Sequence, residues 1–141
     1  MNSSTRRVFL VVFLLGTDVS SNAAELPIPQ IDPLDGLQFQ GETGEKGKAK
    51  HHNDTIAFDN GKFRSIDCEE WGFEPAPYTY KKVGNSYQFS ATLPSSKRGT
   101  LTWEGIIKDD KAEASFRWLH KRWYWTIDRE YWFKGNLKNT P

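Results

Sequence analysis

Cysteine is almost absent from this sequence: Cys68 is the only one among 141 residues. A single cysteine excludes an internal disulfide, so packing alone must stabilise the fold. Long apolar runs are also missing, because the longest spans only residues 8–15. That run is too short to cross the roughly 30 Å hydrocarbon core of a bilayer as a helix. We therefore expect no integral membrane association.

An excess of charge of either sign is lacking too. The chain has 19 Lys and Arg against 18 Asp and Glu, and residues 24–141 alone carry 17 of each. A nucleic-acid-binding protein needs a basic surplus to displace the counterions of phosphates, so the sequence predicts no nucleic-acid partner. A strongly anionic partner is disfavoured on the same grounds.

Catalytic motifs are missing as well. The sequence contains neither the G-x-S-x-G pattern of α/β-hydrolases nor the H-E-x-x-H pattern of zinc proteases. No nucleophilic side chain has an evident base beside it. The sequence therefore gives no support for an enzyme, and its function is sought in binding.

The N-terminus has the pattern of an export signal. Arg6 and Arg7 precede the apolar run, and Ser21 and Ala23 place small residues at the −3 and −1 positions of a cleavage site. We predict a signal peptide over residues 1–23 and a periplasmic or secreted protein. Residues 24–35 contain three prolines and are predicted to form an extended arm, and residues 36–138 a single β-barrel domain.

From Leu37 onward, apolar residues recur at every second position, which predicts β-strands. Three short hairpins follow from turn residues: Asn-Gly at 60–61 suits a type I′ turn, Gly-Asn at 84–85 a type II′ turn, and Asp-Asp at 109–110 is a weaker signal. The third hairpin has the best register, with Trp103 opposite Phe116. A slip of one residue would expose its whole apolar face, so the pattern fixes the register.

The fold class is predicted to be all-β: an eight-stranded antiparallel up-and-down barrel or strongly curved sheet, lipocalin-like, with a two-sheet sandwich as the alternative. An aromatic-x-Gly step at Gly41, Gly105 and Gly135 predicts sharp strand bends or close packing. The predicted strands are residues 36–41, 54–59, 62–67, 77–83, 86–93, 99–108, 111–119 and 129–137.

Such a topology separates short and long connections. Alternate connections of an up-and-down barrel emerge at the same end, so the three tight turns share one end and the four longer loops share the other. Binding functions concentrate on long loops held by a rigid scaffold. We therefore expect a site at the long-loop end.

The leading hypothesis for this end is non-catalytic binding of a small apolar or aromatic ligand. Trp71, Trp123 and Trp125 would supply contact area, and His120 and Arg122 would act as polar anchors. The alternative is that these aromatic side chains plug the barrel as core. A further hypothesis is a protein–protein interaction or inhibitor module that uses the same aromatic end as a flat contact surface.

A metal or haem site is another alternative, and no cofactor is expected otherwise. His51, His52, Cys68 and His120 fall in the predicted loops, and such residues ligate copper, zinc or haem iron. Their spacing matches no metal-binding motif, so solvated histidines are the competing interpretation. Cys68 is interpreted as a small buried apolar residue.

Residues 54–80, followed by 99–118 and 129–137, resemble a group of small bacterial exported proteins of unknown function. This resemblance implies export and a periplasmic location, and it implies no activity. The strand layout is also similar in kind to lipocalin-like, or calycin, barrels, which hold small ligands. The sequence lacks the early Gly-x-Trp signature of lipocalins, so the resemblance carries over no ligand-binding residues.

Overall fold

The computed structural model describes residue 16 and residues 31–139. The predicted signal peptide, apart from Gly16, and residues 24–30 of the predicted arm lie outside these described residues.

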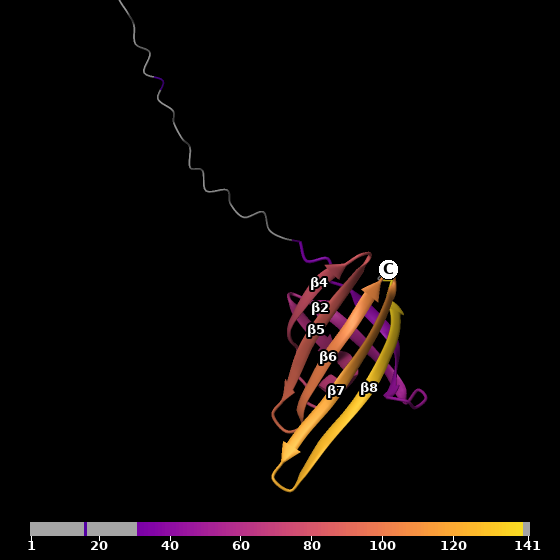
Figure 1. Cartoon of the computed structure of the whole chain (residues 1–141), viewed down its shortest axis with the longest axis vertical. Coiled ribbons are helices and arrows are strands. Elements are labelled where there is room, and N and C mark those ends of the chain that lie inside the picture. The colour runs from indigo at the N-terminus through magenta and orange to yellow at the C-terminus, as the bar shows by residue number, and fades with distance from the viewer. Residues whose placement is uncertain (1–15, 17–30, 140–141) are drawn as a thin grey trace, which may run out of the picture. The chain divides into compact units, whose positions relative to one another are not determined.

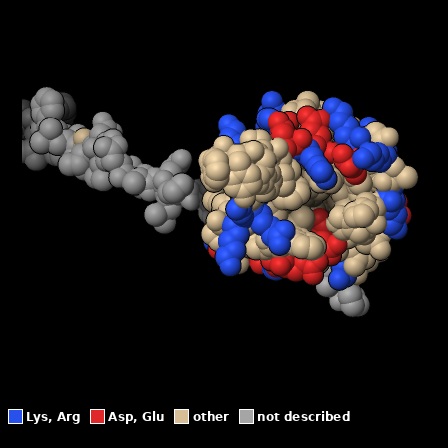
Figure 2. Space-filling view, turned by 90° about the horizontal axis from the view of Figure 1, so that it is seen from below, with Lys and Arg blue, Asp and Glu red and all other residues tan. Residues whose placement is uncertain are grey.

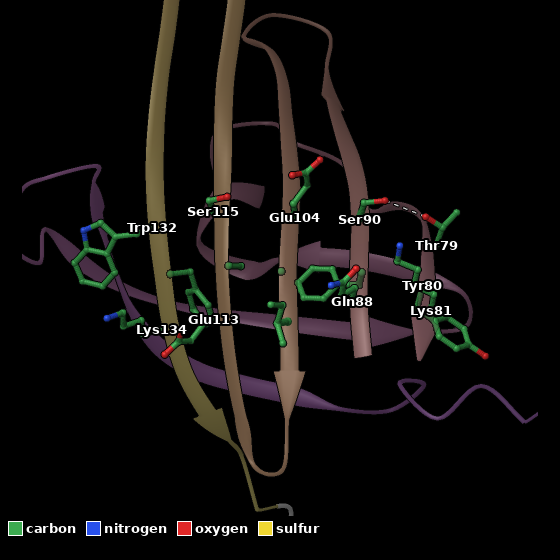
Figure 3. A pocket seen from close by; sticks show the side chains of 15 residues that line it. Thr79, Tyr80, Lys81, Gln88, Ser90, Glu104, Glu113, Ser115, Trp132 and Lys134 are labelled. Carbon is green, nitrogen blue, oxygen red and sulfur yellow. Dashed lines mark hydrogen bonds between the residues drawn. The ribbon is translucent and has the colours of Figure 1, made fainter. Parts of the chain in front are cut away.

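The described chain is all-β, as predicted. Its eight antiparallel strands pair in sequence order, and pairing of the first with the last closes the sheet into a barrel (Figure 1). In Figures 1 and 3, the first three strands cross behind the wall formed by the other five. The elements are β1 Gln38–Glu45, β2 His52–Asp59, β3 Lys62–Ser65, α1 Ile66–Glu69, β4 Ala76–Val83, β5 Ser86–Ser95, β6 Gly99–Lys108, β7 Lys111–Arg122 and β8 Trp125–Leu137.

The three predicted hairpins form with the predicted register. Trp103 lies opposite Phe116 in the β6–β7 hairpin, where the two rings stack with centroids 4.1 Å apart. Asn60 and Gly61 both have positive φ, as a type I′ turn requires. Asp109 also adopts a positive φ of 54°, so this turn forms although its sequence is a weak signal.

The aromatic-x-Gly steps allow strands to approach closely, as predicted. A Cβ atom on Gly41 would lie 2.0 Å from the Lys134 carbonyl oxygen, and one on Gly105 would lie 2.5 Å from the Phe89 ring. Gly41 stands directly opposite Gly135 where β1 meets β8. Only glycine fits at these positions, so the steps set how tightly the barrel closes.

Side chains fill the interior of the barrel. Trp103, Phe39, Phe58, Phe63 and Phe133 are all fully buried. The Trp103 ring also contacts Phe63, with centroids 5.2 Å apart, so aromatic rings from the non-neighbouring strands β6 and β3 meet inside the barrel. The sequence left open whether these rings line a cavity or fill the barrel, and the structure shows a packed core.

Residues 31–36 form a turn that closes the tight-turn end, whereas the sequence predicted an extended arm up to residue 35. Leu34 is fully buried in the core. The Gly36 N–H donates a hydrogen bond of 2.7 Å to the Phe58 carbonyl oxygen, and the Tyr78 hydroxyl donates one to the Asp32 carboxylate. Leu34 stands alone between Pro33 and Asp35, so no apolar periodicity in the sequence indicated that it is buried.

One predicted strand end is replaced by a helical turn. The strand predicted over residues 62–67 stops at Ser65, and α1 begins at Ile66. The buried carboxylate of Asp54 accepts hydrogen bonds from the Ser65 hydroxyl, over 2.5 Å, and from the Asp67 N–H, over 3.1 Å. Because Asp54 binds the first turn of α1 in this way, the chain leaves the sheet after Ser65.

The loop predicted over residues 120–128 does not form. Instead, β7 continues to Arg122 and β8 begins at Trp125, with only Trp123 and Tyr124 between them. Neither turn residue has positive φ, so the turn does not need the Gly and Asn found in the turns at 60–61 and 84–85. That missing signal is why the sequence suggested a loop here.

Candidate functional site

The longer connections lie at one end of the barrel, as predicted. Residues 46–51, 66–75, 96–98 and 123–124 emerge there, opposite the three tight turns. In Figure 1 this end points downward, and the β7–β8 hairpin reaches furthest. The predicted asymmetry of the barrel is therefore present, although the connection between β7 and β8 is a tight turn.

Four aromatic side chains at this end are exposed. The exposed fractions are 94% for Trp123, 58% for Tyr124, 52% for Trp71 and 37% for Trp125. These side chains do not plug the barrel as core. We call this set, together with the neighbouring His120, Arg98 and Arg122, the aromatic end.

Cation–π and ring contacts form within two parts of the aromatic end, one around Trp71 and one on the β7–β8 hairpin. The Arg98 guanidinium lies 4.8 Å from the centre of the Trp71 ring, and Arg122 lies 5.6 Å from that of Trp125. The His120 and Trp125 rings meet edge to face at 5.4 Å. Trp71, Trp125, His120 and Arg122, all predicted as site residues, therefore lie at one end with specific contacts.

The end of the β7–β8 hairpin stands clear of the neighbouring strands. β7 pairs with β6 only as far as Leu119, and β8 pairs with β1 only as far as Tyr131. Residues 120–127 thus form a two-stranded ribbon with no sheet neighbour among residues 31–139, visible as the lowest part of Figure 1. On the barrel-facing side of this ribbon, Trp125 and Ile127 face Arg122 and His120 across the strands.

Charges of both signs surround the aromatic end. Figure 2, which views the molecule from this end, shows acidic and basic side chains distributed around it with uncharged surface between them. Arg117 binds the Asp128 carboxylate through two hydrogen bonds of 2.7 and 2.6 Å. Hydrogen bonding from Arg117 lowers the pKa of Asp128, so this pair stays ionised on the outer face of β7 and β8.

The histidines and the cysteine do not form the metal site considered from the sequence. Among the described residues, no group of three or more His, Cys, Asp or Glu side chains is arranged to hold a metal ion. His51 and His52 stack edge to face with each other, and His52 lies 3.8 Å from an Asp67 carboxylate oxygen. His120 lies on the ribbon beside Trp125.

Burial raises the pKa of the Asp54 carboxyl, although the Ser65 hydroxyl and the Asp67 N–H stabilise its charged form. Because the pKa of Asp54 is higher in the folded protein than in the unfolded chain, where it is 3.8, the protonated carboxyl favours the folded state. This contribution to stability is complete below pH 3.8 and is lost as the pH rises through the pKa of Asp54 in the folded protein. Relative to Asp54→Asn, the wild type should therefore lose stability as pH increases from below 3.8 towards neutrality. Urea unfolding of both proteins across this range measures the difference, in which the carboxyls distant from Asp54 cancel. If the stability of the wild type relative to Asp54→Asn rose with pH instead, burial would not be what governs the pKa of Asp54.

Burial also raises the pKa of the Cys68 thiol, to about 12. The thiolate is the reactive form, so native Cys68 should react with iodoacetamide at least about 100-fold more slowly than the same thiol in the unfolded chain. Mass spectrometry of timed samples in buffer and in denaturant gives the two rates. Equal rates would show that Cys68 is an accessible, reactive thiol.

The outer wall of β4–β8 carries a shallow concavity of about 730 Å³ that sequence reasoning missed (Figure 3). Its lining is mixed, with Glu104, Ser115 and Gln88 beside the apolar Ile106 and Trp132. The Thr79 and Ser90 hydroxyls form a hydrogen bond of 2.9 Å with each other. Its lining residues come from five strands, so no local sequence pattern brings them together. The concavity is open to solvent, whereas an apolar ligand is normally enclosed by hydrophobic side chains.

Comparison with family models, with curated proteins and with solved structures found no match to this chain. Within the described part of the chain, no helix has the length and apolar character needed to span a membrane.

Proposed function

We propose that this chain is an exported, non-catalytic protein-binding module whose aromatic end contacts its partner. One observation carries the proposal: exposed Trp, Tyr and Arg side chains cluster at one end of a barrel whose interior is filled. The basic and apolar pattern of residues 1–23 and the resemblance to bacterial exported proteins support a periplasmic or secreted location.

The residue types of the aromatic end favour a protein partner. Trp, Tyr and Arg are the side chains that most often dominate the binding energy of protein interfaces. Trp123, at 94% exposure, presents nearly its whole indole to solvent. Clustered large aromatic side chains exposed in this way mark an interaction surface on a soluble domain.

A small apolar ligand is less well supported than a protein. Such a ligand needs a concave, mostly apolar pocket. The lipocalin-like alternative would place that pocket inside the barrel, where Trp103 and the surrounding phenylalanines are packed. The concavity on the outer wall has a mixed lining and is too open to enclose such a ligand. A small ligand is therefore one of the outcomes that the test must separate.

Site-directed photocrosslinking in the protein's native cells tests this proposal. A photoreactive phenylalanine analogue replaces Trp123 in one variant and Val83 in another. Val83 is a matched control, because it is also exposed, at 47%, but lies beside the tight turn between β4 and β5. We expect a discrete protein adduct from position 123 and none from position 83.

Two results would overturn the proposal. Adducts of equal yield from both positions would show that the contacts are nonspecific. Absence of a protein adduct at position 123, together with saturable quenching of Trp fluorescence by a fatty acid or an aromatic compound, would assign the aromatic end to a small ligand instead.

A further inference from the structure

The strand edge of the β7–β8 ribbon is open on the β8 side. β1 pairs with β8 only as far as Tyr131. The last backbone hydrogen bond on the β1 side of β8 runs from the Lys46 N–H to the Glu130 carbonyl oxygen, over 2.9 Å. Residues 125–129 continue beyond this contact in strand conformation, with no described residue paired along their outer edge. An unpaired edge of this kind is a template for another strand.

The direction of the backbone groups on this edge follows from two hydrogen bonds. The Leu137 N–H points to the β7 side, where it donates to the Asp110 carbonyl oxygen over 2.7 Å, and the Glu130 carbonyl points to the other side. Backbone groups alternate along a strand, so odd residues of β8 face β7 and even residues face the open edge. Thr126 and Asp128 therefore present their N–H and C=O groups outward.

We propose that a second copy of this chain occupies the edge, by antiparallel pairing of residues 125–129 about a twofold axis at Ile127. This register places Thr126 opposite Asp128 of the second copy as a hydrogen-bonded pair, and Ile127 opposite itself as a non-hydrogen-bonded pair. The register therefore pairs the two residues, Thr126 and Asp128, whose backbone N–H and C=O groups point to the open edge. The inference rests on the proposed function, whose protein partner it identifies.

The side chains of this register are complementary as well. Trp125 of one copy faces Arg129 of the other on the same side as Ile127, so the two ends of the pairing each gain a cation–π contact. The Ile127 side chains, half-buried in one copy, cover each other at the centre. No proline, glycine or lysine interrupts residues 125–129, although natural sheets use proline and lysine to block open edges.

The same register brings the exposed turn into contact. If the antiparallel register is extended past residue 125, Trp123 and Tyr124 of each copy point towards the end of β1 in the other copy. At that end of β1, Lys46 and Glu130 form an ion pair of 2.7 Å. Aromatic rings beside a lysine ammonium form a favourable contact. The exposed tip and the open edge thus belong to one continuous surface.

The twofold axis at Ile127 provides a sharp test, because the same residue meets itself. Ile127→Lys and Ile127→Asp should each be monomeric in sedimentation equilibrium at concentrations where the wild type dimerises. An equal mixture of the two variants should form a heterodimer, because opposite charges then face each other. Recovery in the mixture also shows that both variants are folded.

A backbone substitution tests the hydrogen-bonded pair. Thr126→Pro removes an N–H that has no partner in the described chain, and proline is tolerated on strand edges. We expect the dimer dissociation constant to rise at least about tenfold, equivalent to about 1.4 kcal/mol. Thr126→Ala keeps the N–H and should leave the constant nearly unchanged.

A monomeric wild type at every concentration, or a variant mixture that fails to associate, would overturn the inference. The proposed function would survive that result if photocrosslinking at position 123 still captured a different protein. Adducts of twice the chain mass would support both proposals together.

Discussion

Replacing Gly41 with alanine is expected to lower the free energy of unfolding by about 3 kcal/mol or more, or to prevent folding. The new Cβ would lie 2.0 Å from the Lys134 carbonyl oxygen and 2.5 Å from the Gly135 Cα. Both atoms belong to the backbone of β8, so no side chain can move aside. The strands that close the barrel would have to separate, and their hydrogen bonds would lengthen.

Gly47→Ala is the control for this substitution. Gly47 has a φ of 79° but nothing within 4 Å of its would-be Cβ, so alanine there adds backbone strain without a clash. That strain costs about 1 kcal/mol. Urea denaturation of both variants gives the comparison. Equal losses of stability would contradict the close approach of β1 and β8.

Replacing Leu34 with alanine is expected to destabilise the protein by about 2–5 kcal/mol. Leu34 precedes the first strand yet is fully buried among the core side chains at the tight-turn end. Its removal would leave a cavity there, because the walls are held by the barrel hydrogen bonds and cannot collapse to fill it.

Ile31→Ala provides the matched comparison for Leu34→Ala. Ile31 lies three residues earlier and is 90% exposed, so its truncation should change stability by less than about 0.5 kcal/mol. Denaturant unfolding followed by Trp fluorescence measures both variants. If Leu34→Ala were as mild as Ile31→Ala, residues 31–36 would not be an integral part of the barrel.

Much of this fold could be predicted from the sequence, because period-two alternation and turn residues are both local signals. The β6–β7 hairpin shows this best: large apolar side chains such as Trp103 and Phe116 coincide in only one register, although its Asp-Asp turn is weak. Once consecutive hairpins are placed, the order of strands and the end at which each connection emerges follow from geometry.

The parts that could not be predicted depend on contacts between distant residues. α1 replaces the end of a predicted strand because Asp54, from the preceding strand, binds its first turn. Leu34 is buried because it reaches across a barrel end that only the closed fold creates.

The aromatic end was located correctly along the chain but described incorrectly in its local structure. Trp125 and Ile127 continue the alternation of β8, and this signal could have indicated a longer hairpin. The turn residues Trp123 and Tyr124 carry none of the usual turn preferences, so the sequence indicated a loop. The contact of Arg98 with Trp71 joins two separate connections and has no local signal.

The central claim is that the aromatic end is covered in the protein's native setting, and cysteine labelling tests it most directly. In a Cys68→Ala background, Lys121→Cys reports on the aromatic end and Asn85→Cys on the opposite end; both parent residues are exposed. A membrane-impermeant maleimide is applied to intact native cells and to dilute purified protein. We expect position 121 to label several-fold more slowly in cells than in solution, with position 85 unchanged. Equal labelling of position 121 in both settings would contradict the claim.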